Sequence, residues 1–469
     1  MTTECTQSTF EFHSLNQRKV IARFDGGNIT SDAGIVLLRE VEKRTGLIAS
    51  LAECFRDYRD QRWVEHTVEE LLGQRLFGLC LGYEDLNDHD QLRSDPMLAV
   101  AVGKADPLGM NRLREEDRGK ALAGKSTLNR LELGKVGETD KYKKILMQES
   151  EIDAWIVRAF LDAHVTAPEE IVLDLDATDD LIHGNQEGRF FHGYYGNYCY
   201  LPLYIFSGEH LLCARLRRSN IDGAEGSVEE LTRIAEQIRK TWPAVKIVIR
   251  ADSGFCREEL MWWCESEQID YVLGLAKNER LNKEIAELLQ QAEAQFHQTQ
   301  QPSRVFKDFR YQTRSSWSRE RRVIGKAEWM DKGANPRFVV TSLSPERMDA
   351  RAVYEDFYCA RGNMENRIKE QQLDMFADRT SAATMRANQL RLYLSSAAYI
   401  LMHALRRLGL KNTDLAHAQC HTIRLKLLKI GAQVRVTVRN IWISLAGGYP
   451  YADTFAAVVG NLQALPQRC

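Results

Sequence analysis

Acidic side chains follow two short apolar runs in the middle of the chain. Residues 171–180 read IVLDLDATDD, with Asp174 and Asp176 at the end of the run. Residues 246–254 read KIVIRADSG, with Asp252 after the run and a Ser-Gly turn beyond it. Neighbouring strands lie about 5 Å apart, so carboxylates at two strand ends can share one divalent cation. A turn or capping role is the ordinary explanation for a single aspartate of this kind.

A third acid, Glu365, lies in the stretch YCARGNMENRIKEQQ at residues 358–372. Tyr358, Arg361, Glu365 and Lys369 follow one another at spacings of three or four residues, which places them on one face of a helix. Such a face is ordinarily a solvated surface with ion pairs. Only its combination with the two aspartates points to a catalytic face instead.

The acids need a sheet to bring them together, and the sequence around them predicts one. The predicted strands are 171–178, 198–208, 210–217, 245–253 and 271–276, and the predicted helices are 226–242, 257–267 and 278–296. Three strands followed by alternating helices and strands predict one mixed sheet packed between helices.

The regions on either side of this alternation have different patterns. The N-terminal third is predicted to be mainly helical, with helices within 31–83 and over 141–165. Strands are predicted again within 304–343, and two long helices over 350–370 and 382–408. Glu365 is thereby placed on a helix that follows a second group of strands.

These residues together resemble the DDE transposases of bacterial insertion sequences, in the group marked by a Tyr-x2-Arg-x3-Glu signature. Tyr358, Arg361 and Glu365 match that signature. The family's first Asp stands in Asp-x-Thr, as Asp176 does, and its second stands in Ala-Asp-x-Gly, as Asp252 does. The resemblance makes these three acids the catalytic residues and metal ligands, with Asp174 as an additional candidate ligand.

Other stretches resemble the 1380 family of insertion sequences in particular, so that the resemblance covers nearly all of the chain. They are DGGNITSDAG at 25–34, NDHDQLRSDPML at 87–98, STLNRLE at 126–132 and HGNQEG at 183–188. The broader signature ends in a Lys seven residues after the Glu, whereas this chain has Gln372 there. Lys369, one helical turn from Glu365, is expected to serve in its place.

The resemblance implies an α/β fold with an RNase H-like catalytic core, a mixed sheet flanked by helices. The expected regions are a mainly helical N-terminal region at 1–167, which binds DNA ends or dimerises, the core at 168–277 and 345–412, a β-rich insertion at 278–344 and a C-terminal segment at 413–469. The two parts of the core are thus expected to be separated by the insertion.

Two Mg²⁺ ions are the implied cofactor, with Mn²⁺ as a substitute. In-line cleavage of a phosphodiester needs an activated nucleophile and a stabilised leaving oxygen, and two ions about 4 Å apart meet both needs. Mg²⁺ prefers hard oxygen ligands, so no His or Cys cluster is expected. His183 and His192 are accordingly interpreted as ordinary polar residues. Tyr358, Arg361 and Lys369 are expected to position the DNA.

Local positive charge is expected to contact DNA, because the whole chain has a formal net charge of only −2. Residues 304–326 contain eight Lys or Arg and two acids, and residues 421–440 contain five and none. The predicted DNA contacts in the first stretch are Trp317, Arg319, Arg321 and Arg322. Trp317 has two interpretations, stacking on an unpaired base near a transposon end or packing in a core.

The composition, 44% apolar and 27% charged, is that of an ordinary globular protein. No signal peptide or apolar run of about 18 residues is found, so no membrane partner is expected. The ten cysteines stand singly, without a zinc-knuckle pair. We expect a bacterial cytoplasmic protein, associated with the nucleoid when it acts. The expected partner is double-stranded DNA, as terminal inverted repeats and as target, bound by a homodimer.

Two alternatives stay open. The first is an RNase H-like DNA nuclease that hydrolyses DNA without strand transfer, because its metal chemistry would be the same. The second is a catalytically silent DNA-binding derivative of a transposase. The complete Tyr-x2-Arg-x3-Glu run favours the transposase over the nuclease, and the presence of all three acids argues against a silent derivative.

Overall fold

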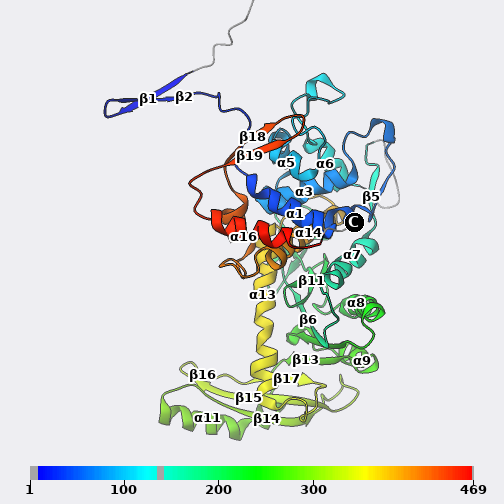
Figure 1. Cartoon of the computed structure of the whole chain (residues 1–469). Helices are drawn as coiled ribbons and strands as arrows, with labels where there is room; N and C mark the ends of the chain where they lie inside the picture. The colour runs from blue at the N-terminus through cyan, green and yellow to red at the C-terminus, as the bar shows by residue number, and fades with distance from the viewer. Residues whose placement is uncertain (1–8, 135–141, 467–469) are drawn as a thin grey trace, which may run out of the picture. The chain divides into compact units, whose positions relative to one another are not determined.

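The computed structural model describes residues 9–134 and 142–466, which divide into two compact units (Figure 1). Unit 1 consists of residues 1–147 and 401–469, and unit 2 of residues 148–400. Cys5, Cys469 and the first residue of the helix predicted over 141–165 lie outside the described ranges. Within those ranges, no helix combines the length and the apolar character that crossing a lipid bilayer requires.

Unit 1 is mainly helical, as the sequence predicts for residues 31–83. The helices there are α1 (Val36–Thr45), α2 (Leu47–Ala52) and α3 (Val68–Leu81). A capping box starts α3: the hydroxyl of Thr67 accepts from the backbone N–H of Glu70, whose carboxylate accepts from the N–H of Thr67. The other helices of the unit are α4 (His89–Leu92), α5 (Pro96–Val102), α6 (Lys125–Glu132), α15 (Cys420–Ile423) and α16 (Ala452–Gln463).

Short strands join distant parts of unit 1. β1 (Phe10–Leu15) and β2 (Arg18–Ala22) form a hairpin, and β3 (Ile29–Thr30) pairs with β18 (Ala432–Val436), which also pairs with β19 (Ile441–Leu445). β4 (Phe55–Asp57) pairs with β5 (Ile145–Met147). The helix predicted from residue 141 was therefore wrong at its start, because pairing with β4 makes 145–147 a strand.

Unit 2 is built on a nine-stranded mixed sheet. Along the sheet the order is β11-β10-β6-β12-β13-β17-β15-β14, with β16 paired to β15. The strands are β6 (Glu170–Ala177), β10 (Leu203–Ser207), β11 (His210–Arg215), β12 (Lys246–Ala251), β13 (Asp270–Leu275), β14 (Ser303–Tyr311), β15 (Arg321–Met330), β16 (Gly333–Ala334) and β17 (Arg337–Thr341). Parallel pairs join β6 to β12 and β12 to β13, and antiparallel pairs join the others. The predicted mixed sheet is thus present, and the strands expected within 304–343 continue it beyond β13 (Figure 1).

Alternate residues of these strands enter two different cores. In β13, Tyr271 and Leu273 pack into the larger core, whereas Val272 between them packs into the smaller one. The larger core also takes side chains from α7 (Glu149–Asp162), α8 (Ser227–Thr241) and α9 (Glu258–Ser266). The smaller core takes Val353 and Tyr354. Helices therefore cover both faces of the sheet, as predicted.

The remaining elements of unit 2 complete the two layers. α10 (Glu279–Glu284) and α11 (Ala286–Thr299) form the helix predicted over 278–296, and α11 lies against β14 and β15 (Figure 1). β7 (Asp180–Leu181), β8 (Phe190–His192) and β9 (Asn197–Tyr200) form a small separate sheet. α14 (Met385–Gly409) matches the second long helix that was predicted, and its residues belong to both units.

The helix that carries Glu365 changes its winding along its length. It runs through α12 (Ala350–Ala352), η6 (Val353–Tyr358), η7 (Cys359–Arg361), α13 (Gly362–Lys369) and η8 (Glu370–Asp374). We call this segment the signature helix. η6 and η8 are π-helical and η7 is a 3₁₀ turn. Such changes of pitch frequently mark functional sites, and this one falls between Tyr358 and Arg361.

Candidate active site

Asp176 and Asp252 stand at the same edge of the sheet of unit 2. β6 and β12 are adjacent and parallel, and their last register pair joins Leu175 to Ala251. Asp176 follows this pair within β6, and Asp252 follows it as the first residue after β12. The chain then turns after Asp252, whose Oδ1 accepts a hydrogen bond of 2.8 Å from the N–H of Gly254. The two carboxylates are thus held on rigid neighbouring strands, as the sequence predicts.

Glu365 reaches the same place from the signature helix through Arg361. One guanidinium nitrogen of Arg361 lies 3.3 Å from Oδ2 of Asp176, and another lies 2.9 Å from Oε1 of Glu365. The pair on the helix has the i,i+4 spacing that favours such contacts. Arg361 is mostly buried, whereas Glu365 is about half exposed. The first and third predicted acids therefore contact one cationic group.

The pKa values of the cluster reflect this crowding. Burial raises the pKa of Asp176 to about 6; the nearby cation Arg361 opposes this shift, and the negative charges of Asp252 and Glu365 add to it. Burial alone would lower the pKa of Arg361, but the charges of Asp176, Tyr358 and the other two acids raise it. All three acids thus act electrostatically on Arg361, and Asp252 and Glu365 act on Asp176.

The donor set suits a hard divalent cation. Across residues 9–134 and 142–466, no three His, Cys, Asp or Glu side chains are grouped closely enough to hold a metal ion. At this site the positively charged guanidinium of Arg361 pairs with both Asp176 and Glu365. Carboxylate oxygens are the ligands that Mg²⁺ prefers. The residues present therefore fit the expected ion in their chemistry.

Asp174 has a different partner. Its two oxygens accept from Nε and Nη2 of Arg250, at 2.5 and 2.8 Å, and both side chains are buried. Nη1 of Arg250 donates to the backbone carbonyl of Phe357 in the signature helix. Asp174 thus belongs to an ion pair that joins β6, β12 and the signature helix, and both of its oxygens are engaged there. Sequence reasoning did not single out Arg250, although it precedes Asp252 by two residues and so shares its face of the strand.

Tyr358 packs close to the strands because Gly274 has no side chain to block it. A Cβ built on Gly274 in β13 would lie 2.5 Å from the Tyr358 hydroxyl and 2.8 Å from the backbone nitrogen of Ser253. Burial raises the pKa of Tyr358, with Arg361 opposing the shift and Asp252 adding to it. Gly274 was also missed from the sequence, where a lone glycine in an apolar strand was the only signal.

Gln372, at the end of the signature helix, forms a hydrogen bond with a buried aspartate. Its side-chain nitrogen donates 2.8 Å to Oδ1 of Asp180, which is fully buried. Gln372, Asp179 and His183 also line a cavity of about 300 Å³ within unit 2. Lys369, predicted to replace the missing lysine, is exposed one turn from Glu365. Position 372 therefore carries an amide that bonds to one oxygen of a buried acid.

The basic stretch of residues 304–326 is largely folded inward. Trp317 is 6% exposed and packs edge-on against Tyr311, which favours the core interpretation. Arg321 is buried in ion pairs with Glu258 and Glu265. Arg322 is buried and paired with Asp308, and the exposed Arg319 also contacts Glu265. Most of this positive charge is therefore neutralised within the fold.

Comparison with known proteins shows the family. The family model described as "Transposase DDE domain group 1" matches residues 12–467 of the chain. A search of curated proteins found no match.

Among solved structures, a similar one is described as a cryo-EM structure of the piggyBac transposase synaptic complex with hairpin DNA. Its TM-score is 0.41 at 10% identity, over 85% of this chain and 80% of that chain. A likeness at that level carries no argument about the function of this chain.

Proposed function

Since this chain belongs to the DDE transposases, we propose that it cuts DNA at the terminal inverted repeats of an insertion sequence and joins the ends to target DNA. The observation that supports this most directly is that three acids from distant parts of the sequence lie near enough to Arg361 for their charges to raise its pKa. Asp176 and Asp252 lie on neighbouring parallel strands, and Arg361 links Asp176 to Glu365. That arrangement suits metal-dependent phosphodiester chemistry.

The proposed cofactor is Mg²⁺, as two ions held by Asp176, Asp252 and Glu365, with Mn²⁺ as a substitute. When bound, the ions would activate the attacking oxygen and stabilise the leaving oxygen. The raised pKa of Asp176 fits this proposal, because crowded carboxylates favour any cation that neutralises them.

The protein residues around the acids would position the DNA. Arg361 has a fork suited to a phosphate, and that fork would become available once Mg²⁺ replaced it as the partner of Asp176 and Glu365. Tyr358 lies on the same helix as Arg361, and its hydroxyl is close to Asp252. The pair of Asp174 and Arg250 would act through these groups by fixing the signature helix against β6 and β12.

The proposed core is RNase H-like and comprises residues 168–277 and 345–412. Residues 1–167 are proposed to bind DNA ends or to hold a homodimer, in the cytoplasm of a bacterium. Support for the core comes from the mixed sheet with helices on both faces and from the acids at the ends of adjacent strands.

The central test is substitution of the second acid. Asp252→Asn in the full chain is expected to abolish Mg²⁺-dependent cleavage of the terminal repeats, measured on labelled DNA, while end binding stays nearly unchanged. The matched control is Asp356→Asn, which removes an exposed acid from the signature helix and should cut normally. Cleavage by the Asp252 variant at the wild-type rate would refute the assignment.

The same assay separates the alternatives. A nuclease without strand transfer would cut the ends and leave them unjoined to a target plasmid, whereas a transposase joins them. A catalytically silent derivative would bind the ends and cut nothing.

A further inference from the structure

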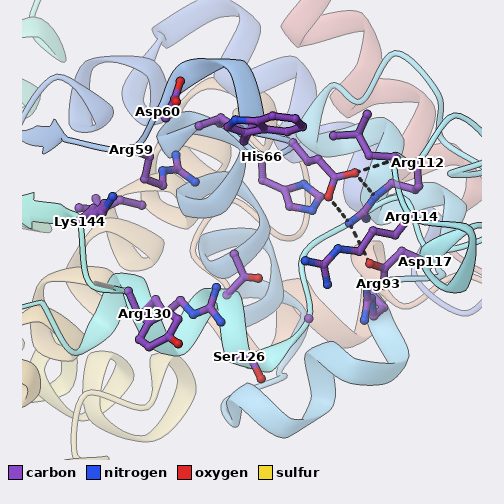
Figure 2. Close-up of a pocket in the computed structure, with 18 of the residues that line it drawn as sticks. Arg59, Asp60, His66, Arg93, Arg112, Arg114, Asp117, Ser126, Arg130 and Lys144 are labelled. Atoms are coloured by element: carbon purple, nitrogen blue, oxygen red, sulfur yellow. Dashed lines mark hydrogen bonds and ion pairs between the residues drawn. The ribbon is translucent and has the colours of Figure 1, made fainter. Parts of the chain in front are cut away.

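A large cavity in unit 1 is lined by positively charged side chains. Its volume is about 920 Å³. The cations that line it are Arg59, Arg93, Arg112, Arg114, Arg130 and Lys144. Figure 2 shows Arg59, Arg130 and Lys144 on one side of the cavity, and Arg93, Arg112 and Arg114 on the other. We call it the arginine-lined cavity.

Four acids also line the cavity, and each already has a partner. Glu65 accepts two bonds of 3.1 Å from Arg112, and Asp117 accepts one of 2.7 Å from Arg93. Asp60 is bound by Arg62, outside the lining, and Asp90 by the backbone and side chain of Lys125. The acids thus neutralise only part of the charge that faces the cavity.

Arg59 is paired with Asp57, whereas Arg114 and Arg130 are exposed to an incoming ligand. Arg114 reaches Glu116 only at 3.7 Å, and both side chains are about three-quarters exposed, so this pair holds weakly. The guanidinium of Arg130 lies over the ring of Tyr142, 5.3 Å from its centroid. Arg130 therefore keeps its N–H groups for an acceptor, since the ring contact uses only the face of the guanidinium.

The pKa of His66 shows which charges act within the arginine-lined cavity. Burial lowers its pKa to about 3, and the positive charges of Lys104 and Arg112 add to the shift, with Glu65 opposing it. The imidazole is therefore neutral near pH 7. Three cations, Lys104, Arg112 and Arg93, thus act on His66 against the one acid Glu65, and such a surplus of positive charge stabilises an anion.

The start of α6 faces the same cavity. Gly124 precedes the helix, and Ser126 and Thr127 in its first turn line the cavity. A Cβ on Gly124 would lie only 3.0 Å from Nη1 of Arg93, so a side chain here would crowd that guanidinium. Nε of Arg93 is buried and has no hydrogen-bond partner among the described residues. The positive end of a helix and a hydroxyl-bearing first turn add to the anion-binding character.

An aromatic ring at the cavity indicates which anion is bound. Trp63 lines the cavity and is 74% exposed, an unusual position for an indole. Exposed aromatic faces beside Lys and Arg are the combination that proteins use to bind DNA strands, through base stacking and phosphate contacts. A free phosphate would explain the cations and leave Trp63 without a role.

We propose that the arginine-lined cavity binds the phosphates of a DNA strand at a transposon end, with Trp63 stacking on an unpaired base of that strand. The proposal rests on the function proposed above and assigns the end-binding role to a specific place in unit 1. It makes Arg114 and Arg130 phosphate contacts.

The test measures binding by the full chain carrying Asp252→Asn, so that no cutting occurs. The probe is a fluorescent duplex of the terminal repeat with a short single-stranded overhang, titrated at several salt concentrations. Arg114→Gln with Arg130→Gln should weaken binding about tenfold and reduce the slope of log K against log salt by about 2, one for each phosphate that is no longer neutralised. The control, Lys43→Gln with Arg118→Gln, removes two exposed cations of unit 1 outside the cavity.

Trp63→Ala gives a second readout. It should weaken binding of the overhang probe more than binding of a blunt duplex, because only the overhang offers an unpaired base. Circular dichroism melting of each variant checks that unit 1 remains folded.

Three results would overturn the inference. One is a cavity variant that binds with the same affinity and salt slope as the control. Another is an equal effect of Trp63→Ala on both probes. The third is calorimetric binding of inorganic phosphate that the cavity variant abolishes, with DNA binding unaffected. Metal-dependent cutting by the wild-type chain is scored separately, so failure here is distinguishable from failure of the proposed function.

Discussion

Asp180 is a carboxyl whose pKa is set mainly by its burial. Gln372 donates to one of its oxygens, and the other has no hydrogen-bond partner among the described residues. Burial raises its pKa to about 8; the bond from Gln372 opposes the shift, and the charges of Asp378 and Asp179 add to it. The carboxyl is therefore protonated in the folded chain at pH values where an unfolded chain would have it ionised.

This predicts a pH dependence of stability. The folded pKa lies above the unfolded value near 4, so the stabilisation is complete below about pH 4 and is lost as the pH rises to about 8. In the wild-type chain the melting temperature should fall between pH 4 and pH 8. In the Asp180→Asn variant that fall should be smaller by roughly 5 °C. Differential scanning calorimetry measures it, with Asp356→Asn as the exposed control. An unchanged slope would contradict the assignment.

Single side chains also show what could be predicted from the sequence. Helical spacing predicts that Arg361 and Glu365 are neighbours, and they form an ion pair. The contact of Arg361 with Asp176 joins positions far apart in the chain and depends on packing. The same holds for Arg321, which was predicted to meet DNA but is paired with Glu258 and Glu265. Local composition cannot reveal partners that only the fold brings near.

Strand β13 carries the glycine that gives the signature helix its close approach. Gly274→Ala would place a methyl group within 3 Å of the Tyr358 hydroxyl and of the backbone at Ser253. Either the Tyr358 side chain or the backbone at Ser253 must move, and Ser253 is bonded directly to Asp252. We expect a decrease of about 1–3 kcal/mol in unfolding free energy and a marked fall in cleavage rate, measured by denaturant unfolding and by the DNA-cutting assay.

The matched control is Gly362→Ala at the start of α13. No atom lies within 4 Å of a Cβ built there, so alanine should be neutral or stabilising by up to about 1 kcal/mol. If both alanine variants cut DNA at the wild-type rate, the close approach at Gly274 has no part in positioning Tyr358.

Elements were predicted well where their pattern is local. The buried strands β6 and β12 read as apolar runs, and α8 reads as an amphipathic helix, so their positions follow from periodicity. β5 was missed because its three residues become a strand only by pairing with β4, far away in the sequence. The π and 3₁₀ turns of the signature helix leave no periodic signal, since they change the pitch for only a few residues.

At the scale of the molecule, paired transposon ends require two active sites. We therefore expect two chains of the Asp252→Asn variant to assemble on terminal-repeat DNA, because one chain supplies one set of acids. Sedimentation or light scattering of the complex measures the stoichiometry, with a scrambled duplex of the same length as control. A complex that contains a single chain and a single duplex, at concentrations well above the dissociation constant, would contradict this.

Unit 1 draws on both ends of the chain, since Thr30 in β3 pairs with Ala432 in β18. During synthesis, the ribosome delivers all of unit 2 before the strand that completes this small sheet exists. A polypeptide terminated early, before Ala432, would keep the three acids proposed to bind metal and would lack the strand that pairs with β3. A frameshift late in the gene would therefore yield a protein that retains these acids and has an incomplete unit 1.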